Sequence, residues 1–152
     1  TIIEDKLIES AIAIIYYCLY SWMPVNLVYY TKEIVTVKAN NPFDFQNIYK
    51  RLAEIRFTAG FNISDMLDVY IKSSTIKTNL LILTSSLSYD LYNIIYYASF
   101  SGFNAIVEYI SPDEFTGSIY EQAENIISNI PKIGAHIYKI SINDEIKPVL
   151  ER

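Results

Sequence analysis

The sequence predicts an α/β fold, with a mostly parallel sheet and helices on both faces, and three consecutive patterns lead to this prediction. Residues 80–83 form a continuous apolar run, as expected of a strand buried on both faces of a parallel sheet. Residues 87–101 then show a helical apolar period that ends at Gly102, and residues 103–110 form a second apolar run. A strand, a crossover helix and a second parallel strand make the right-handed unit of such a sheet.

The elements at the amino end follow from local signals. A helix is predicted over residues 3–21, because apolar residues share one stripe and acidic residues lie in the first turn. Pro24 prevents this helix from continuing. The β-branched and aromatic runs at 25–30 and 34–39 predict a hairpin, and the second run alternates as a strand at a sheet edge would.

Helices and strands also surround the central unit. One helix is predicted at 43–57, with a Pro near its first position, and another at 65–73, capped by Asn62 or Ser64. After the central unit we expect a helix, a last strand and a short closing helix, at residues 118–130, 134–141 and 144–150.

Length, charge and cysteine content limit the class of protein to which this chain can belong. The 152 residues, 51% of them hydrophobic, are enough for one core, so a single domain over residues 1–152 is predicted. The net charge is -5 and the basic residues are scattered, which argues against nucleic acid or anionic lipid as a partner. The single Cys18 excludes a disulfide framework and indicates an intracellular compartment.

The most apolar window is too short to cross a membrane. It covers residues 11–23, about thirteen residues, whereas a spanning helix needs roughly twenty. We therefore expect the fragment itself to be soluble. Because Thr1 is not preceded by a Met, a basic segment or a small-residue cleavage site, we expect the chain to be part of a longer protein.

One group of polar residues lies where α/β proteins bind ligands. Thr84, Ser85 and Ser86 follow a predicted strand at its carboxyl end, the usual ligand position in open sheets. No Gly-rich loop or Lys follows to hold a phosphate, so capping of the next helix is the favoured interpretation. Together with Asn62, these residues are the candidate ligand or partner site, and no catalytic arrangement emerges.

The other candidate residues are interpreted as structural. His136 lies in an apolar strand without a Cys or second His to complete a metal set. Asp113 and Glu114 are interpreted as solvated loop charges. The chain also contains three tyrosine pairs, at 16–17, 29–30 and 96–97. Their spacing favours positions in the core and at its rim, and the lack of interleaved basic residues argues against stacking on nucleic acid.

Three segments together carry a resemblance: RLAEIRFTAGFNISDMLDVYI, NLLILTSSLSYDLYNIIYYASFSGFNAIVEYI and GAHIYKISINDEI. They contain an apolar strand, a short polar turn, a helix closed by Gly102, a second strand, an acidic loop and a last strand followed by an Asp-Glu helix start. In this order, over nearly the whole chain, they resemble the carboxyl-terminal half of bacterial domain-of-unknown-function family fifty-eight. The core of that family is similar to a von Willebrand factor A domain.

The resemblance implies a three-layer, Rossmann-like fold of von Willebrand factor A type with a degenerate metal site. Such domains bind a metal through an Asp-x-Ser-x-Ser motif after the first strand, a later Thr, and an Asp after the fourth strand. Here the first motif would precede Thr1, Phe61 stands in place of the Thr, and Thr84 and Ser85 stand where the Asp is expected. Because these oxygen ligands are lost, we expect neither Mg²⁺ nor Mn²⁺ to bind, and no cofactor.

The resemblance also implies that the first, central strand of the sheet is missing from this fragment. Its absence would leave two strand edges unpaired. Either the edges close on each other, or another chain pairs there, as in a homodimer, or the amino-terminal elements are assigned wrongly.

Two functions are predicted. The first, implied by the resemblance, is a non-enzymatic protein-interaction or adaptor domain of a membrane-anchored protein, at the cytoplasmic face of the bacterial membrane. Its expected partner is a MoxR-type AAA ATPase that acts in complex assembly or maturation. The alternative is a small-ligand-binding or enzymatic doubly wound domain that uses the turn at residues 84–86 with Asn62.

Overall fold

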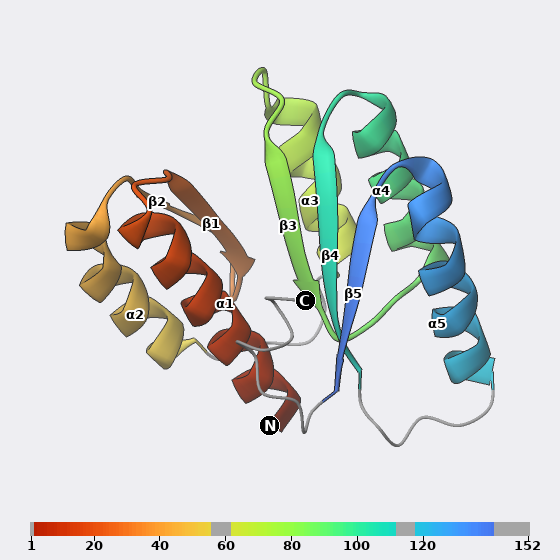
Figure 1. Ribbon diagram of the computed structural model, residues 1–152, viewed down its shortest axis with the longest axis horizontal. Helices are drawn as coiled ribbons and strands as arrows, with labels where there is room; N and C mark the ends of the chain where they lie inside the picture. Colours follow the sequence, from red (N-terminus) through yellow and green to blue (C-terminus); the bar gives the residue numbers. More distant parts are fainter. Residues whose placement is uncertain (1, 56–61, 112–117, 142–152) are drawn as a thin grey trace. The chain divides into compact units, whose positions relative to one another are not determined.

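The computed structural model describes residues 2–55, 62–111 and 118–141, and the chain divides into two compact units (Figure 1). Of the described residues, 2–55 belong to the first unit, and 62–111 and 118–141 belong to the second. The single domain expected over residues 1–152 stays a prediction.

The first unit is a pair of helices with a β-hairpin. Its elements are α1 (Ile2–Tyr20), β1 (Val25–Tyr30), β2 (Ile34–Ala39), a 3₁₀ turn η1 (Pro42–Asp44) and α2 (Phe45–Glu54). The strands β1 and β2 are antiparallel, with Val25 opposite Ala39 and Tyr30 opposite Ile34, so the predicted hairpin is confirmed with its bounds. Helix α1 contacts α2 and β1, and α2 contacts β2.

Helix α1 ends in a left-handed residue that is not glycine. The amide of Trp22 donates to the Leu19 carbonyl at 3.0 Å and the amide of Met23 donates to the Cys18 carbonyl at 2.8 Å, which is the Schellman pattern. In that pattern the residue after the helix adopts positive φ, and Trp22 has φ 59. A bulky side chain in this conformation is strained, because its Cβ approaches the neighbouring carbonyl.

The second unit is a three-stranded parallel sheet flanked by helices. Its elements are α3 (Ile63–Ser73), β3 (Asn79–Thr84), α4 (Tyr89–Phe100), β4 (Asn104–Ser111), α5 (Ser118–Asn129), a 3₁₀ turn η2 (Ile130–Ile133) and β5 (His136–Ser141). The strand order is β3-β4-β5, and both pairs are parallel. The strand, helix and parallel strand predicted from residues 80–110 are thereby confirmed.

The described helices of this unit pack against one face of the sheet. Leu80 and Ile82 of β3 share a buried cluster with Ala105, Val107 and Tyr109 of β4, and these residues alternate along their strands. Side chains that alternate along a strand point to one face. The same cluster contains residues of α3, α4 and α5, so all three helices cover that face (Figure 1). The second helical layer and the von Willebrand factor A-type order stay predictions.

Several boundaries differ from the sequence prediction by one or two residues. The helix predicted from residue 65 begins at Ile63, because Asn62 is its cap. The helix predicted from residue 43 begins instead with the 3₁₀ turn η1. The predicted helix at 144–150, the acidic pair Asp113 and Glu114, and Phe61 lie outside the described residues. In the described part of the chain, no helix combines the length and apolar character needed to cross a membrane.

Candidate functional site

Asn62, the first predicted site residue, serves as a helix cap. Its Oδ1 atom accepts a hydrogen bond from the amide of Asp65 at 2.9 Å and another from the Ser64 hydroxyl at 2.6 Å. An amide at this position satisfies one of the open N–H groups of the first turn. Both contacts belong to the start of α3, so the structure gives Asn62 a structural use, and its role in a ligand site stays a prediction.

Thr84, Ser85 and Ser86 form the turn after β3 but do not cap the next helix. The Thr84 hydroxyl donates to the Ser86 carbonyl at 2.9 Å and accepts from the Ser86 amide at 3.2 Å. Helix α4 is capped instead by Ser88, whose Oγ accepts from the Leu91 amide at 3.1 Å. The prediction that residues 84–86 cap this helix is therefore wrong, because the Thr84 hydroxyl is used within its own turn.

A row of polar side chains crosses the carboxyl edge of the sheet. Thr84, Tyr109 and Lys139 stand in register on neighbouring strands β3, β4 and β5. Thr84 and Tyr109 are buried. Because Tyr109 shares the face covered by the helices, this row lies on the helix side of the sheet. Open α/β folds bind ligands at the carboxyl ends of their strands, which this row approaches. Sequence reasoning found Thr84 but not the other two members.

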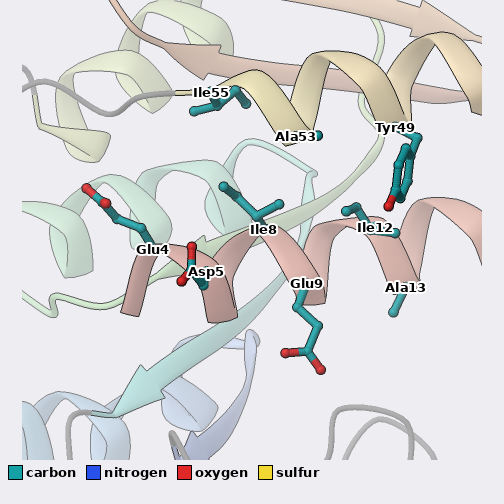
Figure 2. Close-up of a pocket in the computed structure, with 9 residues that line it drawn as sticks. All are labelled: Glu4, Asp5, Ile8, Glu9, Ile12, Ala13, Tyr49, Ala53 and Ile55. Carbon is teal, nitrogen blue, oxygen red and sulfur yellow. The ribbon is translucent and has the colours of Figure 1, made fainter. Parts of the chain in front are cut away.

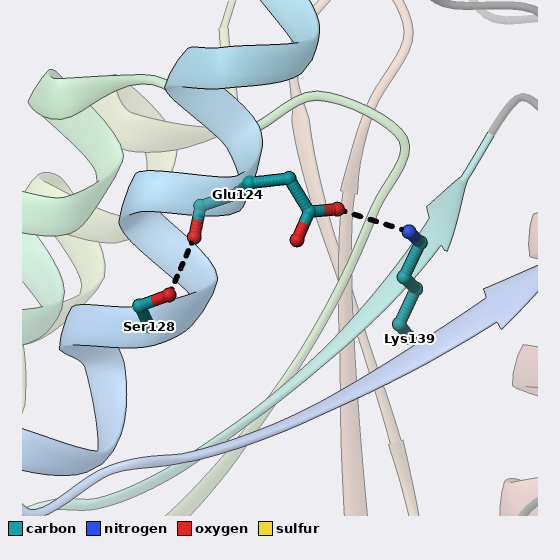
Figure 3. A network of polar contacts seen from close by, with 3 residues as sticks. All are labelled: Glu124, Ser128 and Lys139. Atoms are coloured by element: carbon teal, nitrogen blue, oxygen red, sulfur yellow. Dashed lines mark hydrogen bonds and ion pairs between the residues drawn. The ribbon is translucent and has the colours of Figure 1, made fainter.

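Charges on α5 and β5 extend this row. Figure 3 shows the Lys139 ammonium pointing to the Glu124 carboxylate, with Nζ and Oε1 3.1 Å apart, while the Ser128 hydroxyl donates to the Glu124 backbone carbonyl. Burial raises the pKa of Tyr109, whereas a hydrogen bond with Ser111 and the positive charge of Lys139 act in the opposite direction. The edge is thus polar but already partnered within the protein.

Glu108 is a buried carboxyl group that the sequence analysis did not single out. It lies in the middle of β4, is only 3% exposed, and its Oε2 atom has no hydrogen-bond partner among the described residues. In register it stands between Leu83 of β3 and Tyr138 of β5, on the face opposite the helices. Burial raises its pKa from 4.5 to about 7. The sequence feature that could have identified Glu108 is a single acidic residue within the apolar strand NAIVEYIS.

The first unit contains a groove between its two helices. It has a volume of about 700 Å³ and is lined mainly by apolar side chains, with three carboxylates from α1. Figure 2 shows Ile8 and Ile12 of α1 pointing toward α2, and Tyr49 of α2 pointing back toward α1. Glu4 and Asp5 line the end of the groove that lies at the amino end of α1.

A chain of aromatic rings continues from the groove. The rings of Tyr16 and Tyr20 stack with centroids 4.3 Å apart, Phe45 meets Tyr16 edge-on at 5.2 Å, and Phe45 lies 6.1 Å from Tyr49. Tyr49 therefore belongs both to the groove and to the ring chain. We call the continuous strip formed by these residues the α1–α2 surface; its members are Ile8, Ile12, Tyr16, Tyr20, Phe45 and Tyr49.

The exposure of these rings corrects the interpretation of the tyrosine pairs. Tyr16, Tyr17, Tyr96 and Tyr97 are all exposed, so the prediction that these two pairs lie in the core and at its rim is wrong. The pair at 29–30 is half-buried. The apolar period of α1 continues around the helix, and periodicity alone could not tell which side the rest of the fold would cover.

His136 begins β5 and is exposed, and its interpretation as a structural histidine stays a prediction. Among the described residues, no group of three or more His, Cys, Asp or Glu side chains is placed to hold a metal ion.

No protein-family model matches this chain, and no curated protein matches it. The resemblance to domain-of-unknown-function family fifty-eight accordingly stays a prediction.

Proposed function

We propose that this chain is a non-enzymatic protein-interaction domain and that the α1–α2 surface is its contact site. The observation that carries the proposal is the exposed aromatic chain of the first unit. Connected apolar side chains on a surface mark a region that gains free energy when a partner covers it. Tyrosine and tryptophan are also the residues that contribute most to protein contacts.

The residues next to the ring chain support the same proposal. Tyr17 is 67% exposed and Trp22 is 66% exposed, so both large side chains face solvent near the carboxyl end of α1. Trp22 is also held in the strained left-handed conformation. Strain of this kind costs about 1–3 kcal/mol and persists most often where function requires it. The strain and the exposure of Trp22 together support the proposal that this end of α1 contacts a partner.

The resemblance supplies the finer part of the proposal. It suggests a von Willebrand factor A-like, Rossmann-like adaptor domain of a membrane-anchored bacterial protein, working at the cytoplasmic face of the membrane. It also suggests a MoxR-type AAA ATPase as the partner, acting in the assembly or maturation of a complex.

Site-specific photo-cross-linking tests the proposal. A photoreactive phenylalanine analogue replaces Tyr17 in one variant and Tyr96 of α4, an exposed tyrosine of the second unit, in the control. In cells of the source organism we expect the Tyr17 variant to yield one predominant protein adduct that the control does not yield. The adduct should disappear when Tyr16 and Tyr20 are both replaced by Ser. Identical adducts from both positions would exclude the α1–α2 surface as the contact site.

The polar row of Thr84, Tyr109 and Lys139 favours a second candidate, a ligand-binding or enzymatic domain. Its position at the carboxyl edge of a parallel sheet is the usual ligand position of this architecture. Lys139→Met would remove the positive charge of the row. The candidate predicts that an anionic metabolite stabilises the wild-type protein to heat but not this variant. A screen of such metabolites with no wild-type shift would exclude it.

A further inference from the structure

The chemistry of the groove points to the kind of partner that the α1–α2 surface accepts. Its apolar lining includes Ile8, Ile12 and Ala53, and its charged lining residues are Glu4, Asp5 and Glu9. The nearby Lys6 pairs with Glu9, their charged atoms 3.4 Å apart. One end of the surface is therefore acidic and the other aromatic.

The dimensions of the surface match a helix. Phe45 contacts Tyr16 and Tyr20 near the carboxyl end of α1, whereas Ala53 lines the groove beside Ile8, so α1 and α2 are antiparallel. From Glu4 to Tyr20, α1 covers about 24 Å at 1.5 Å per residue. A helix of about sixteen residues can lie along this length, with apolar side chains at three- and four-residue spacing over Ile8, Ile12 and the rings.

Charge decides which helix fits. A partner with basic residues at the end that meets Asp5 and Glu9 gains attraction, whereas an acidic partner is repelled. The same carboxylates disfavour an anionic membrane surface, which attracts basic segments and repels acidic ones. Because Asp5 and Glu9 are exposed, both can meet a partner without rearrangement of α1.

We propose that the α1–α2 surface binds a basic amphipathic α-helix of another protein, with its apolar stripe on Ile8, Ile12 and the aromatic rings and its Lys or Arg residues against Asp5 and Glu9. This proposal rests on the proposed interaction function and adds the chemical class of the partner.

Binding of synthetic peptides to the full chain tests this inference. The probe is an 18-residue helical peptide with Leu on one face and Lys on the other. One control peptide replaces every Lys by Glu, and a second scrambles the Leu/Lys order so that no apolar face forms. We expect saturable binding of the ordered Leu/Lys peptide alone, weakened by added salt because surface charges are screened.

Charge variants of α1 assign the binding site. In Asp5→Lys/Glu9→Lys, we expect Kd for the Leu/Lys peptide to rise about tenfold, as two exposed charge contacts change sign. Asp5→Asn/Glu9→Gln keeps helix-compatible side chains and should weaken binding to a smaller extent. Glu121→Lys, a reversal at an exposed position of α5, is the matched control and should leave Kd unchanged.

Three outcomes overturn the inference: absence of Leu/Lys peptide binding, equal binding by the scrambled peptide, or an unchanged Kd in both α1 variants. If one of these occurs while the Tyr17 cross-link still captures a protein, the partner class is wrong and the interaction function stands. If the cross-link also fails, the interaction function is wrong as well. Dimerisation of the chain that is lost on replacing Tyr16 and Tyr20 would assign the surface to a second copy and would also overturn the inference.

Discussion

Glu108 should make the stability of this protein fall as pH rises from about 4.5 to about 7. In the folded protein its pKa is raised from 4.5 to about 7, because burial disfavours the charged form of the carboxyl group. Between these two pH values the unfolded chain has lost the proton while the folded protein still holds it. The unfolded state then binds fewer protons, so the free energy of unfolding decreases with increasing pH.

The size of the effect follows from the shift. At about 1.4 kcal/mol for each pKa unit, the raised pKa corresponds to about 3 kcal/mol. This free energy is present in full below about pH 4.5 and is lost above about pH 7, where the carboxyl group is ionised in both states. Since the whole stability of a domain is about 5–15 kcal/mol, the loss is large enough to measure.

Glu108→Gln tests this reasoning, because glutamine has nearly the same shape and does not titrate. Urea unfolding followed by far-ultraviolet circular dichroism from pH 4.5 to 8 should show the decline in the wild-type protein and a flatter profile in the variant. Glu121→Gln, a change at an exposed carboxyl group of α5, should keep the wild-type profile. A Glu108→Gln profile that falls as steeply as the wild type would refute the assignment of the pH dependence to this group.

Three further substitutions test the fold and its caps. Trp22→Gly should raise the free energy of unfolding by about 1 kcal/mol, since glycine adopts positive φ without strain. The same variant should bind the partner more weakly, because an exposed aromatic ring is lost. A destabilised variant would show that the Trp22 side chain contributes packing. Ser88→Ala should destabilise the protein by about 1 kcal/mol through loss of the α4 cap. The control Ser86→Ala should change the free energy of unfolding by less than about 0.5 kcal/mol. Equal destabilisation by the two substitutions would contradict the assignment of Ser88 as the cap. Ile95→Ala, at a fully buried position of α4, should cost about 2–5 kcal/mol by denaturant unfolding, and a cost below about 1 kcal/mol would contradict its place in the core.

Local patterns were sufficient to predict most of the elements. The hairpin was predicted with its bounds because both strands are β-branched runs separated by a polar turn. The parallel pairing of β3 and β4 followed from a helix placed between two apolar strands. Boundaries at α3 and α4 shifted because capping depends on which of several polar residues reaches an open amide. That choice is settled by backbone geometry and not by residue type.

Features set by long-range packing could not be predicted from the sequence. The described helices of the second unit cover one face of the sheet. A continuous apolar strand has the same sequence pattern whichever face the helices cover, so the covered face could not be predicted. The exposure of Tyr16 and Tyr17 depends on which side of an evenly apolar helix its neighbours occupy. Thr84 was found because it follows a strand, but its partners Tyr109 and Lys139 belong to strands whose register only the folded sheet defines.

The most direct test of the interaction account is a nuclear magnetic resonance titration of the isotope-labelled chain with the Leu/Lys peptide. The account predicts that amide shifts change along one stripe of α1, including Glu9, Ile12 and Tyr16, and along the facing side of α2. Amides around Thr84 and Lys139 should stay unchanged. Changes centred on the carboxyl edge of the sheet, or none at saturating peptide, would contradict the claim that the α1–α2 surface is the contact site.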